Sequence, residues 1–424
     1  MSRTTSSAGY VLGLLFAGNL LNFYDRALPA VVLEPIKTEY GLDDTQVGVL
    51  ASAFVLVAAV AGVPLGRLAD RVPRTTVAGW GLVVWSAFTA AGGLLTSFGG
   101  FVASRVGVGA GEASYAPATG SLLSDLYPSE RRSRANAVFM LGFPIGTLLA
   151  FFTAGALAVA FDSWRAPFLI AAVPGFVVAV LVLRLREPAR GAADPGAATG
   201  GTFRSLFRVR SMYGLILAFA GYNFAAYAIG TFLTPVLQRY YGLELVAAGA
   251  VGGVVIGVTG LIGLLVGGRA LDRAASRSLS ARARVAAVSL AAAAVAALAG
   301  LAAAEDRLWQ LVLFLSLAYL LGIIYLAAAV PVVSDVIRPS QRSGALGLLF
   351  AIGYLLGGAG GPIVVGLISD RLAAGDSDAE AWGLRTAMMI AVPAAFAVAS
   401  IGMFLASRFV RADREAMIAG EVTA

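Results

Sequence analysis

Two acidic and two basic side chains stand in segments that are otherwise apolar enough to dissolve in lipid. Asp25 and Arg26 are neighbours in NFYDR, and Arg105 and Glu112 lie seven residues apart in RVGVGAGEASYAPA. A charged side chain at the centre of a bilayer costs at least about 2.5 to 3.5 kcal/mol, and such residues usually face a cavity and serve a function. These four residues are therefore the first candidates for chemistry.

The spacing of Arg105 and Glu112 predicts that both lie on one face of a helix. Seven residues turn an α-helix through about 700° and advance it by about 10 Å. Asp25 should fall at a depth between Arg105 and Glu112, because the two spans run in opposite directions. Glu112 is then farther from Arg105 than Asp25 is, which makes Glu112 the better candidate to titrate near neutral pH.

Two acids and two bases in one place form a near-neutral cluster, and removing one member leaves a partner uncompensated at a cost of about 3 to 5 kcal/mol. We interpret Asp25 and Glu112 as the proton-carrying pair, and Arg26 and Arg105 as the residues that hold an anionic substrate group. The alternative is a structural clamp between the first and fourth spans. Protonation would change the cluster by a full charge, which is the kind of local event that biases a bistable bundle.

The composition is that of a polytopic membrane protein. Of 424 residues, 59% are hydrophobic and 13% charged, against roughly 45 to 50% and 25% in soluble globular proteins. The absence of cysteine excludes disulfides and thiolate metal sites. Histidine is absent too, so proton handling near neutral pH must fall to carboxylates. No metal or cofactor is expected.

About twelve apolar runs are long enough to cross a bilayer. The predicted spans are residues 10–33, 46–65, 77–97, 99–124, 136–160, 167–185, 212–238, 245–267, 283–303, 308–334, 345–368 and 384–406.

Arginine gathers in every second connection, as at 67–74, 131–134 and 269–284, whereas the connection at 34–44 is acidic. This positive-inside asymmetry predicts a multi-pass protein of the cytoplasmic (inner) membrane with both termini in the cytoplasm. It also explains the net charge of +7 without nucleic acid. The preference for arginine over lysine, with abundant alanine, is typical of a GC-rich bacterial genome.

The sequence repeats itself across its one long polar interruption. GRLADR at Gly66 is echoed by GRALDR at Gly268, and SDLYPSERRS at Ser124 by SDVIRPSQRS at Ser334. We predict an all-α integral membrane protein with twelve transmembrane helices in two pseudo-symmetric six-helix bundles, with a substrate site at their interface. The bundles comprise 1–185 and 212–424, the latter with a cytoplasmic tail, and 186–211 forms a cytoplasmic linker.

The loop GRLADRVPR (Gly66 to Arg74) resembles the loop signature of the major facilitator superfamily, although Pro73 stands near where that family prefers glycine. In that superfamily the aspartate that matches Asp70 meets the cytoplasmic start of the eleventh span. The resemblance therefore implies a cytoplasmic gate. The residues that we assign to it are Gly66, Asp70, Arg71, Arg131, Asp272 and Arg273.

A closer resemblance is to the Spinster-like branch of that superfamily. It is carried by NFYDR, RVGVGAGEASYAPA, FPIG (Phe143 to Gly146) and GGPIVVGLISD (Gly360 to Asp370). The resemblance implies secondary active transport of lysophospholipid-like or sphingoid lipids, with Asp25 and Glu112 as the protonatable pair. Sugar-phosphate, aromatic-acid and drug transporters share parts of this pattern.

Intramembrane charge is confined to the N-terminal half, while the C-terminal half offers aliphatic and aromatic surface with scattered polar tips. A cavity with one charged wall and one apolar wall suits an amphiphile. We add Tyr115, Asn223 and Tyr227 to the candidate substrate-binding residues, although a packing role is the alternative for each such polar tip.

The sequence thus predicts a proton-coupled secondary active transporter of a lysophospholipid or related amphiphilic lipid, and a monomer whose other partners are membrane lipids. One alternative is a transporter of the same fold for a small organic anion or drug. A second is an energy-independent lipid scramblase. A membrane-embedded enzyme is disfavoured, because the sequence offers no Ser-His-Asp set and no metal-ligand cluster.

Overall fold

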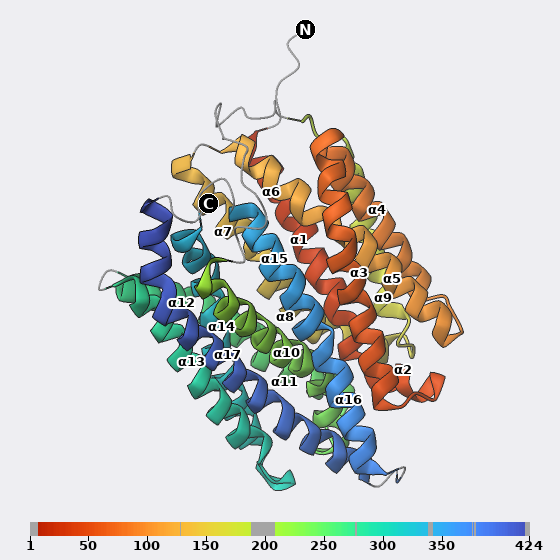
Figure 1. The fold of residues 1–424 in the computed structure, drawn as a ribbon. Helices are drawn as coiled ribbons and strands as arrows, with labels where there is room; N and C mark the ends of the chain where they lie inside the picture. Colours follow the sequence, from red (N-terminus) through yellow and green to blue (C-terminus); the bar gives the residue numbers. More distant parts are fainter. Residues whose placement is uncertain are drawn as a thin grey trace. The chain divides into compact units, whose positions relative to one another are not determined.

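The computed structural model describes residues 7–127, 129–187, 208–275, 278–337, 342–374, 376 and 379–419. Within these ranges every regular element is a helix, and nine helical stretches are long and apolar enough to cross a membrane (Figure 1). The prediction of an all-α integral membrane protein is therefore confirmed.

The chain folds as two compact units. Unit 1 comprises Met1–Leu42, Ala53–Ala197 and Leu245–Gly253, and unit 2 comprises Asp43–Ser52, Ala198–Glu244 and Val254–Ala424. One helix therefore contributes its first turns to unit 2 and the remainder to unit 1. The division at 186–211 into an N-terminal and a C-terminal bundle stays a prediction, because most of that linker lies outside the described residues.

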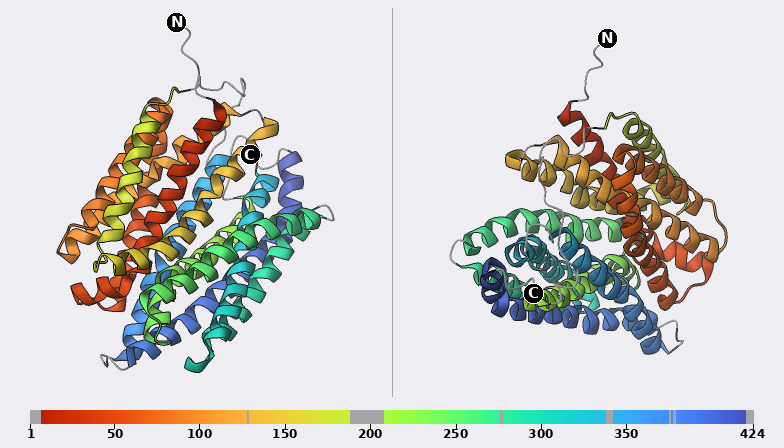
Figure 2. Two further views of the ribbon diagram at one scale, coloured as in Figure 1. Left: turned by 180° about the vertical axis from the view of Figure 1, so that it is seen from behind. Right: turned by 45° about the horizontal axis from the view of Figure 1, so that its top comes forward.

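In unit 1, α1 packs on α8 and α9, and α4 packs on α5 and α9 (Figure 2). The helices of this unit are α1 (Ala8–Val31), α2 (Leu33–Tyr40), most of α3 (Asp44–Arg71), α4 (Arg74–Gly92), α5 (Phe98–Ala113), α6 (Tyr115–Leu126), α7 (Ser129–Met140), α8 (Gly142–Ala160), α9 (Ala166–Leu183) and α11 (Leu245–Gly252).

In unit 2, α17 packs along α10 and α13. The helices of this unit are α10 (Arg210–Arg239), η2 (a π-helix that begins at Gly253 and ends at Val258), α12 (Thr259–Ala275), α13 (Leu279–Leu301), η3 (Glu305–Arg307), α14 (Leu308–Val336), α15 (Arg342–Gly353), the π-helix η5 (Tyr354–Gly358), α16 (Gly360–Ala373) and α17 (Glu380–Ala419).

Several of the expected spans differ from the helices that form, because those at 136–160, 245–267 and 345–368 are each divided into shorter helices. The span predicted at 99–124 is broken into α5 and α6 at Ser114, whose hydroxyl donates to the Gly111 carbonyl at 2.8 Å. The last span, predicted at 384–406, is the 40-residue helix α17. At 1.5 Å per residue α17 is about 60 Å long, about twice the thickness of the bilayer core.

The repeated sequence motifs make matching contacts in the two units. In unit 1, the Arg74 guanidinium at the start of α4 pairs with Asp125 of SDLYPSERRS. In unit 2, Arg282 near the start of α13 pairs with Asp335 of SDVIRPSQRS at 3.0 Å. The repeated sequence motif therefore forms an equivalent arginine–aspartate ion pair in each unit.

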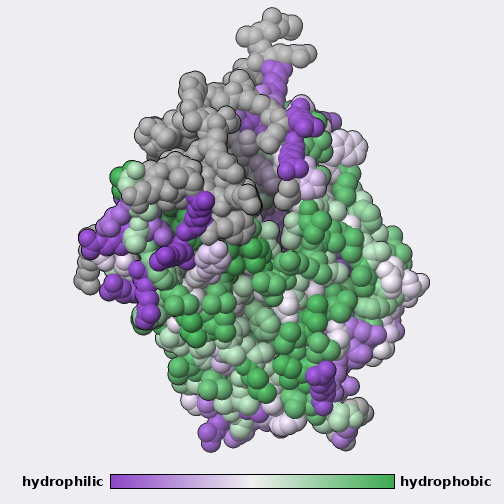
Figure 3. Space-filling model, in the orientation of Figure 1, coloured by the Kyte–Doolittle hydropathy of each residue, from purple (hydrophilic) through white to green (hydrophobic). Residues whose placement is uncertain are grey.

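The outer surface of unit 2 is apolar along the middle of its helices. Figure 3 shows hydrophobic side chains over α17 and its neighbours, with hydrophilic ones gathered toward the helix ends. Large exposed side chains on α17 include Ile390, Val398, Ile401 and Phe404. A soluble protein rarely exposes such a continuous patch, whereas a helix in lipid does.

We predict that Gly146→Ala destabilises unit 1, because a Cβ there would lie 2.1 Å from the carbonyl oxygen of Leu20 on α1. Backbone cannot yield as a side chain can, so α1 and α8 must separate at a cost of about 1 to 3 kcal/mol. Thermal unfolding in detergent should show a lower midpoint. Gly13→Ala is the control, since nothing lies within 4 Å of its added Cβ; an equal loss in both variants would contradict the prediction.

Candidate functional site

The structure brings the four charged residues of the sequence prediction together inside unit 1. Asp25 and Arg26 come from the second half of α1, and Arg105 and Glu112 come from α5. Asp25, Arg105 and Glu112 are each at most 3% exposed. The four charged residues therefore lie together, three of them buried and Arg26 partly exposed. We call Asp25, Arg26, Arg105 and Glu112 the charged cluster.

The shortest contact in the cluster joins Arg26 to Glu112. Arg26 Nε donates to Glu112 Oε2 at 2.7 Å, and the Glu112 side chain is fully buried while that of Arg26 is 26% exposed. A charge-assisted hydrogen bond of this length is among the stronger polar contacts in proteins. This pairing was not expected from the sequence, which had placed Glu112 as the more isolated carboxylate.

Asp25 has weaker partners. Its carboxylate Oδ2 accepts a hydrogen bond from the Thr89 hydroxyl of α4 at 3.3 Å. Arg105 Nη2 donates at 3.3 Å to the main-chain carbonyl of Asp25 rather than to its carboxylate. Arg105 therefore supports the backbone of α1, and the Asp25 carboxylate has a neutral hydroxyl as its nearest hydrogen-bonding group.

Phe54 of α3 contacts both arginines. The Cζ atoms of Arg26 and Arg105 lie 5.1 and 5.8 Å from the centre of its ring, and the ring of Phe23 lies 4.9 Å from Arg26 Cζ. Guanidinium groups over a ring face are attracted to it, most strongly where water is excluded. Phe54 is thus a member of the site that sequence reasoning missed, because one phenylalanine in an apolar run carries no signal.

Three buried polar atoms of the cluster, namely Asp25 Oδ1, Arg105 Nη1 and Glu112 Oε1, have no hydrogen-bond partner in the described part of the chain. Buried polar atoms are nearly always hydrogen-bonded. The cluster therefore contains three buried polar atoms that a further hydrogen-bonding group would satisfy.

Tyr115 is close to the cluster in sequence but is held by packing. Its hydroxyl donates to the Leu15 carbonyl at 2.9 Å, and its ring meets Trp85 edge-on at 5.3 Å between centres. Gly18 makes room for it, since a Cβ there would lie 2.1 Å from the hydroxyl. Its assignment to substrate binding stays a prediction.

Asn223 and Tyr227 belong to α10 in unit 2. Asn223 is buried, and its amide donates to the Phe219 carbonyl one turn earlier at 2.8 Å. The Tyr227 ring lies 6.2 Å from that of Tyr354, within an aromatic group that also contains Phe219 and Phe350. The four aromatic residues form one group of contacting rings in unit 2.

The predicted gating residues lie at helix ends. Gly66 is on α3, where an added Cβ would lie 3.7 Å from Pro117 of α6. Arg71, Arg131 and Arg273 are exposed. The side chains of Asp70 and Asp272 lie outside the described residues, so their roles stay predictions.

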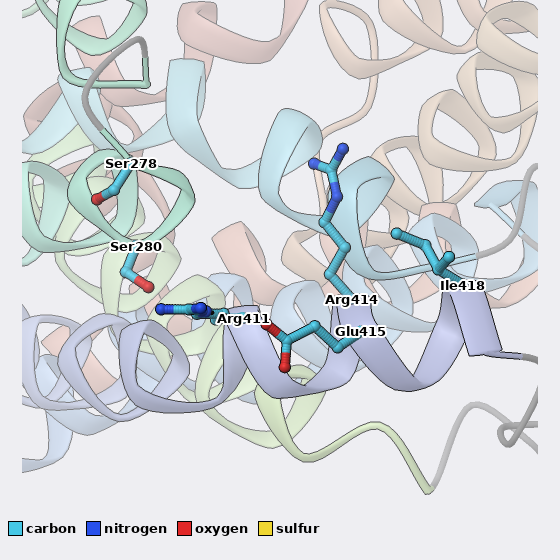
Figure 4. A pocket seen from close by; sticks show the side chains of 6 residues that line it. All are labelled: Ser278, Ser280, Arg411, Arg414, Glu415 and Ile418. Atoms are coloured by element: carbon cyan, nitrogen blue, oxygen red, sulfur yellow. Dashed lines mark hydrogen bonds and ion pairs between the residues drawn. The ribbon is translucent and has the colours of Figure 1, made fainter.

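A pocket of about 320 Å³ lies near the end of α17 in unit 2 (Figure 4). It is lined by Ser278, Ser280, Arg411, Arg414, Glu415 and Ile418. Arg411 pairs with Glu415 at 2.9 Å within the same helix, and both side chains are largely exposed. None of the predicted site residues lines this pocket.

Comparison with known proteins agrees with this geometry. The sequence profile of the Major Facilitator Superfamily matches residues 15–362. The chain is 32% identical over 406 residues to an MFS-type efflux pump of Mycolicibacterium smegmatis, covering 95% of this chain and 93% of that protein. It is 27% identical over 413 residues to the sphingosine-1-phosphate transporter SPNS2 of Danio rerio, covering 92% and 82%.

A solved structure of a bacterial homologue of the human lysosomal transporter Spinster, inward-facing and unoccupied, superposes with a TM-score of 0.86 at 27% identity. The match covers 97% of this chain and 99% of that one. The profile, the relatives and the fold agree with the motifs in the sequence. The chain therefore belongs to the Major Facilitator Superfamily, in its Spinster-like branch, and is a multi-pass membrane transporter rather than an enzyme.

Proposed function

We propose that the protein is a proton-coupled secondary active transporter that moves an amphiphilic lipid with an anionic head, such as a lysophospholipid, by alternating access. The observation that carries this proposal is the charged cluster of unit 1, in which two carboxyls and the Arg105 guanidinium are buried beside the partly exposed Arg26, and three polar atoms lack partners among the described residues. Without histidine in the chain, the proton must bind to Asp25 or Glu112.

The contacts suggest how proton and substrate exchange. While Glu112 is charged, it holds Arg26 at 2.7 Å. A proton on Glu112 ends that ion pair and frees the guanidinium for an anionic head group. Asp25, whose carboxylate contacts the Thr89 hydroxyl, is the second place for a proton, and its charge influences both arginines. The anionic substrate and the ionised carboxylates thus compete for the same two cations, and protonation of a carboxylate favours the substrate.

The head group that fits best is a phosphate. Guanidinium is a planar fork that binds phosphate or carboxylate through two hydrogen bonds, and the cluster offers two such forks. The similarity to a sphingosine-1-phosphate transporter supports a phosphorylated amphiphile. Asn223 and Tyr227 of α10 are proposed as further substrate-binding residues.

We propose that both termini lie in the cytoplasm, which the arginine-rich connections favour by the positive-inside rule. We propose the cytoplasmic membrane as the location and a monomer as the working form. Gly66, Asp70, Arg71 and Arg131, together with the repeated Asp272 and Arg273, are proposed to close the cytoplasmic side.

A second candidate is transport of a small organic anion or drug by the same fold. The similarity to a mycobacterial efflux pump supports it. An energy-independent scramblase is a third candidate. Purified protein in liposomes separates the three, with substrate-dependent proton movement followed by an enclosed pH dye across a panel of lysolipids, short-chain anions and cationic drugs.

We expect lysophospholipids to drive proton movement and short-chain anions of equal charge not to. Proton movement with the anions or drugs alone would favour the second candidate. Lipid transfer that persists after the proton gradient is dissipated, without accumulation, would favour the scramblase. Protein-free liposomes with the same panel are the control, because amphiphiles can make membranes leaky.

Glu112→Gln should abolish proton-driven accumulation while substrate binding is retained, because the amide removes the exchangeable proton and leaves Arg26 available. Accumulation of labelled substrate under an imposed pH difference measures this. Asp25→Asn should also reduce accumulation. Full accumulation in the Glu112→Gln variant would show that Glu112 does not carry the coupled proton.

Arg26→Lys and Arg105→Lys should each weaken binding of a phosphate-headed substrate by about tenfold, the scale of losing one charge-assisted hydrogen bond. Lysine retains the charge but not the fork. Equilibrium binding to purified protein measures the change, and Arg284→Lys, on the exposed surface, is the matched control. If affinity is unchanged in both cluster variants, the arginines serve only as counter-ions for the carboxylates.

A further inference from the structure

The start of α3 is held inside unit 2 by a buried polar network. The Asp44 carboxylate is 1% exposed and accepts two hydrogen bonds from Arg239 Nη1, at 2.9 and 3.0 Å. It also accepts the Ser369 hydroxyl of α16 at 2.7 Å. A buried carboxylate is tolerated only with such compensation, so this end of α3 has a defined seat.

Asp370, a residue of α16, caps the N-terminus of α3. Its two carboxylate oxygens accept the main-chain N–H groups of Asp44 at 3.0 Å and Thr45 at 2.8 Å. The first N–H groups of a helix have no partner within it, and the partial positive charge there favours a carboxylate. We call Asp44, Arg239, Ser369 and Asp370 the α3 seat.

Small residues bring the backbones together along the same face. A Cβ on Gly48 would lie 2.4 Å from the Pro362 carbonyl oxygen, and one on Gly366 would lie 2.2 Å from that of Asp44. The Ser52 hydroxyl donates to the Ala359 carbonyl at 2.6 Å. The motif GGPIVVGLISD therefore has a structural role, which is to seat the start of α3.

Unit 1 contains the matching contact without the charges. There a Cβ on Gly249 of α11 would lie 2.6 Å from the Phe151 carbonyl oxygen, and one on Gly155 would lie 3.3 Å from that of Leu245. Leu245 stands at the start of α11 as Asp44 stands at the start of α3. The α3 seat contains the ion pair between Asp44 and Arg239, whereas the contact at the start of α11 is made by backbone and apolar groups.

The opposite face of α3 contacts the charged cluster two residues later. Ser52 ends the seated stretch, and at about 100° per residue Phe54 points about 200° away from it. Its ring contacts the guanidiniums of Arg26 and Arg105. Its backbone is fixed as well, because a Cβ on Gly109 of α5 would lie 2.7 Å from the Phe54 carbonyl oxygen.

We propose that Phe54 is a positioning residue that transmits the charge state of the cluster to the seat of α3. This inference rests on the proposed function, in which Glu112 gains and loses a proton. When Glu112 is neutral, its ion pair with Arg26 is lost, and the position of Arg26 over the ring is less firmly fixed. The ring is then held less firmly by one of the two cations that fix it, and the helix that carries it is freer to leave its seat.

The amide hydrogens of Asp44 and Thr45 report the seat directly, because they bond to Asp370. Hydrogen–deuterium exchange of a peptide covering residues 43–50 should be faster in Glu112→Gln than in the parent chain, by about fivefold or more, the lower end of usual couplings between sites. Phe54→Leu should remove this difference. Phe54→Tyr, which keeps the ring, should retain it, as should Phe176→Leu on the exposed surface of α9.

Substrate-dependent proton movement is measured on the same preparations. An equal response to Glu112→Gln in the parent chain and in the Phe54→Leu background overturns the inference, as does no response in the parent chain. If the parent chain moves no protons with any substrate, the proposed function fails instead. Should Phe54→Leu not fold, loss of the response in Phe54→Tyr alone would still count against a role for the ring.

Discussion

The ion pair between Arg26 and Glu112 is the interaction on which the rest of unit 1 depends. An ionised carboxylate buried without a cation is costly, and the 2.7 Å contact with Arg26 compensates the charge of Glu112. Because Arg26 and Asp25 are adjacent, the pair also fixes the rotation of α1 and so the position of the second carboxyl. Arg105, bonded to the Asp25 carbonyl, holds the same turn of α1.

This pairing requires helices to approach closely around α5, and its glycines permit the approach. A Cβ on Gly109 would lie 2.7 Å from the main-chain carbonyl oxygen of Phe54 on α3, and one on Gly111 would lie 2.8 Å from the main-chain nitrogen of Trp85 on α4. In lipid there is little hydrophobic force between helices, so association depends on such close packing and on polar contacts. The glycines of GVGAG and the charges of the cluster therefore act together: the first bring the backbones near, and the second fix their rotation.

Much of the fold and the membership of the site follow from the sequence, but the pairing within the site does not. Charges in apolar runs identified Asp25, Arg26, Arg105 and Glu112. Repeated motifs indicated a duplication, but the ion pairs that these motifs form came from the structure. Residue spacing gives the face of a helix to within tens of degrees, which is too coarse to decide whether Arg26 or Arg105 meets Glu112. Thr89 and Phe54 were missed because ordinary residue types in apolar helices carry no sign of their neighbours. One residue more separates Gly249 from Gly268 than separates Gly48 from Gly66, and the π-helix η2 between them takes up such an extra residue.

The glycine contacts at Gly48 and Gly249 show that the two units share the close approach of helix backbones but not the charged groups beside it. Backbone approach at Gly48 and Gly249 is shared, since a side chain at either place would collide with a carbonyl. Charge is not shared, because the α3 seat is built on Asp44, Arg239 and Asp370 while its counterpart begins at an apolar Leu245. A packed apolar contact responds little to a distant change of charge, whereas an ion pair with a helix cap depends on geometry to within tenths of an ångström. The helix that contributes Phe54 to the charged cluster, α3, is also the helix whose first residue lies in a charged seat. A single helix thus has one end whose hold depends on polar geometry and, ten residues on, a ring set against the guanidinium groups of the charged cluster.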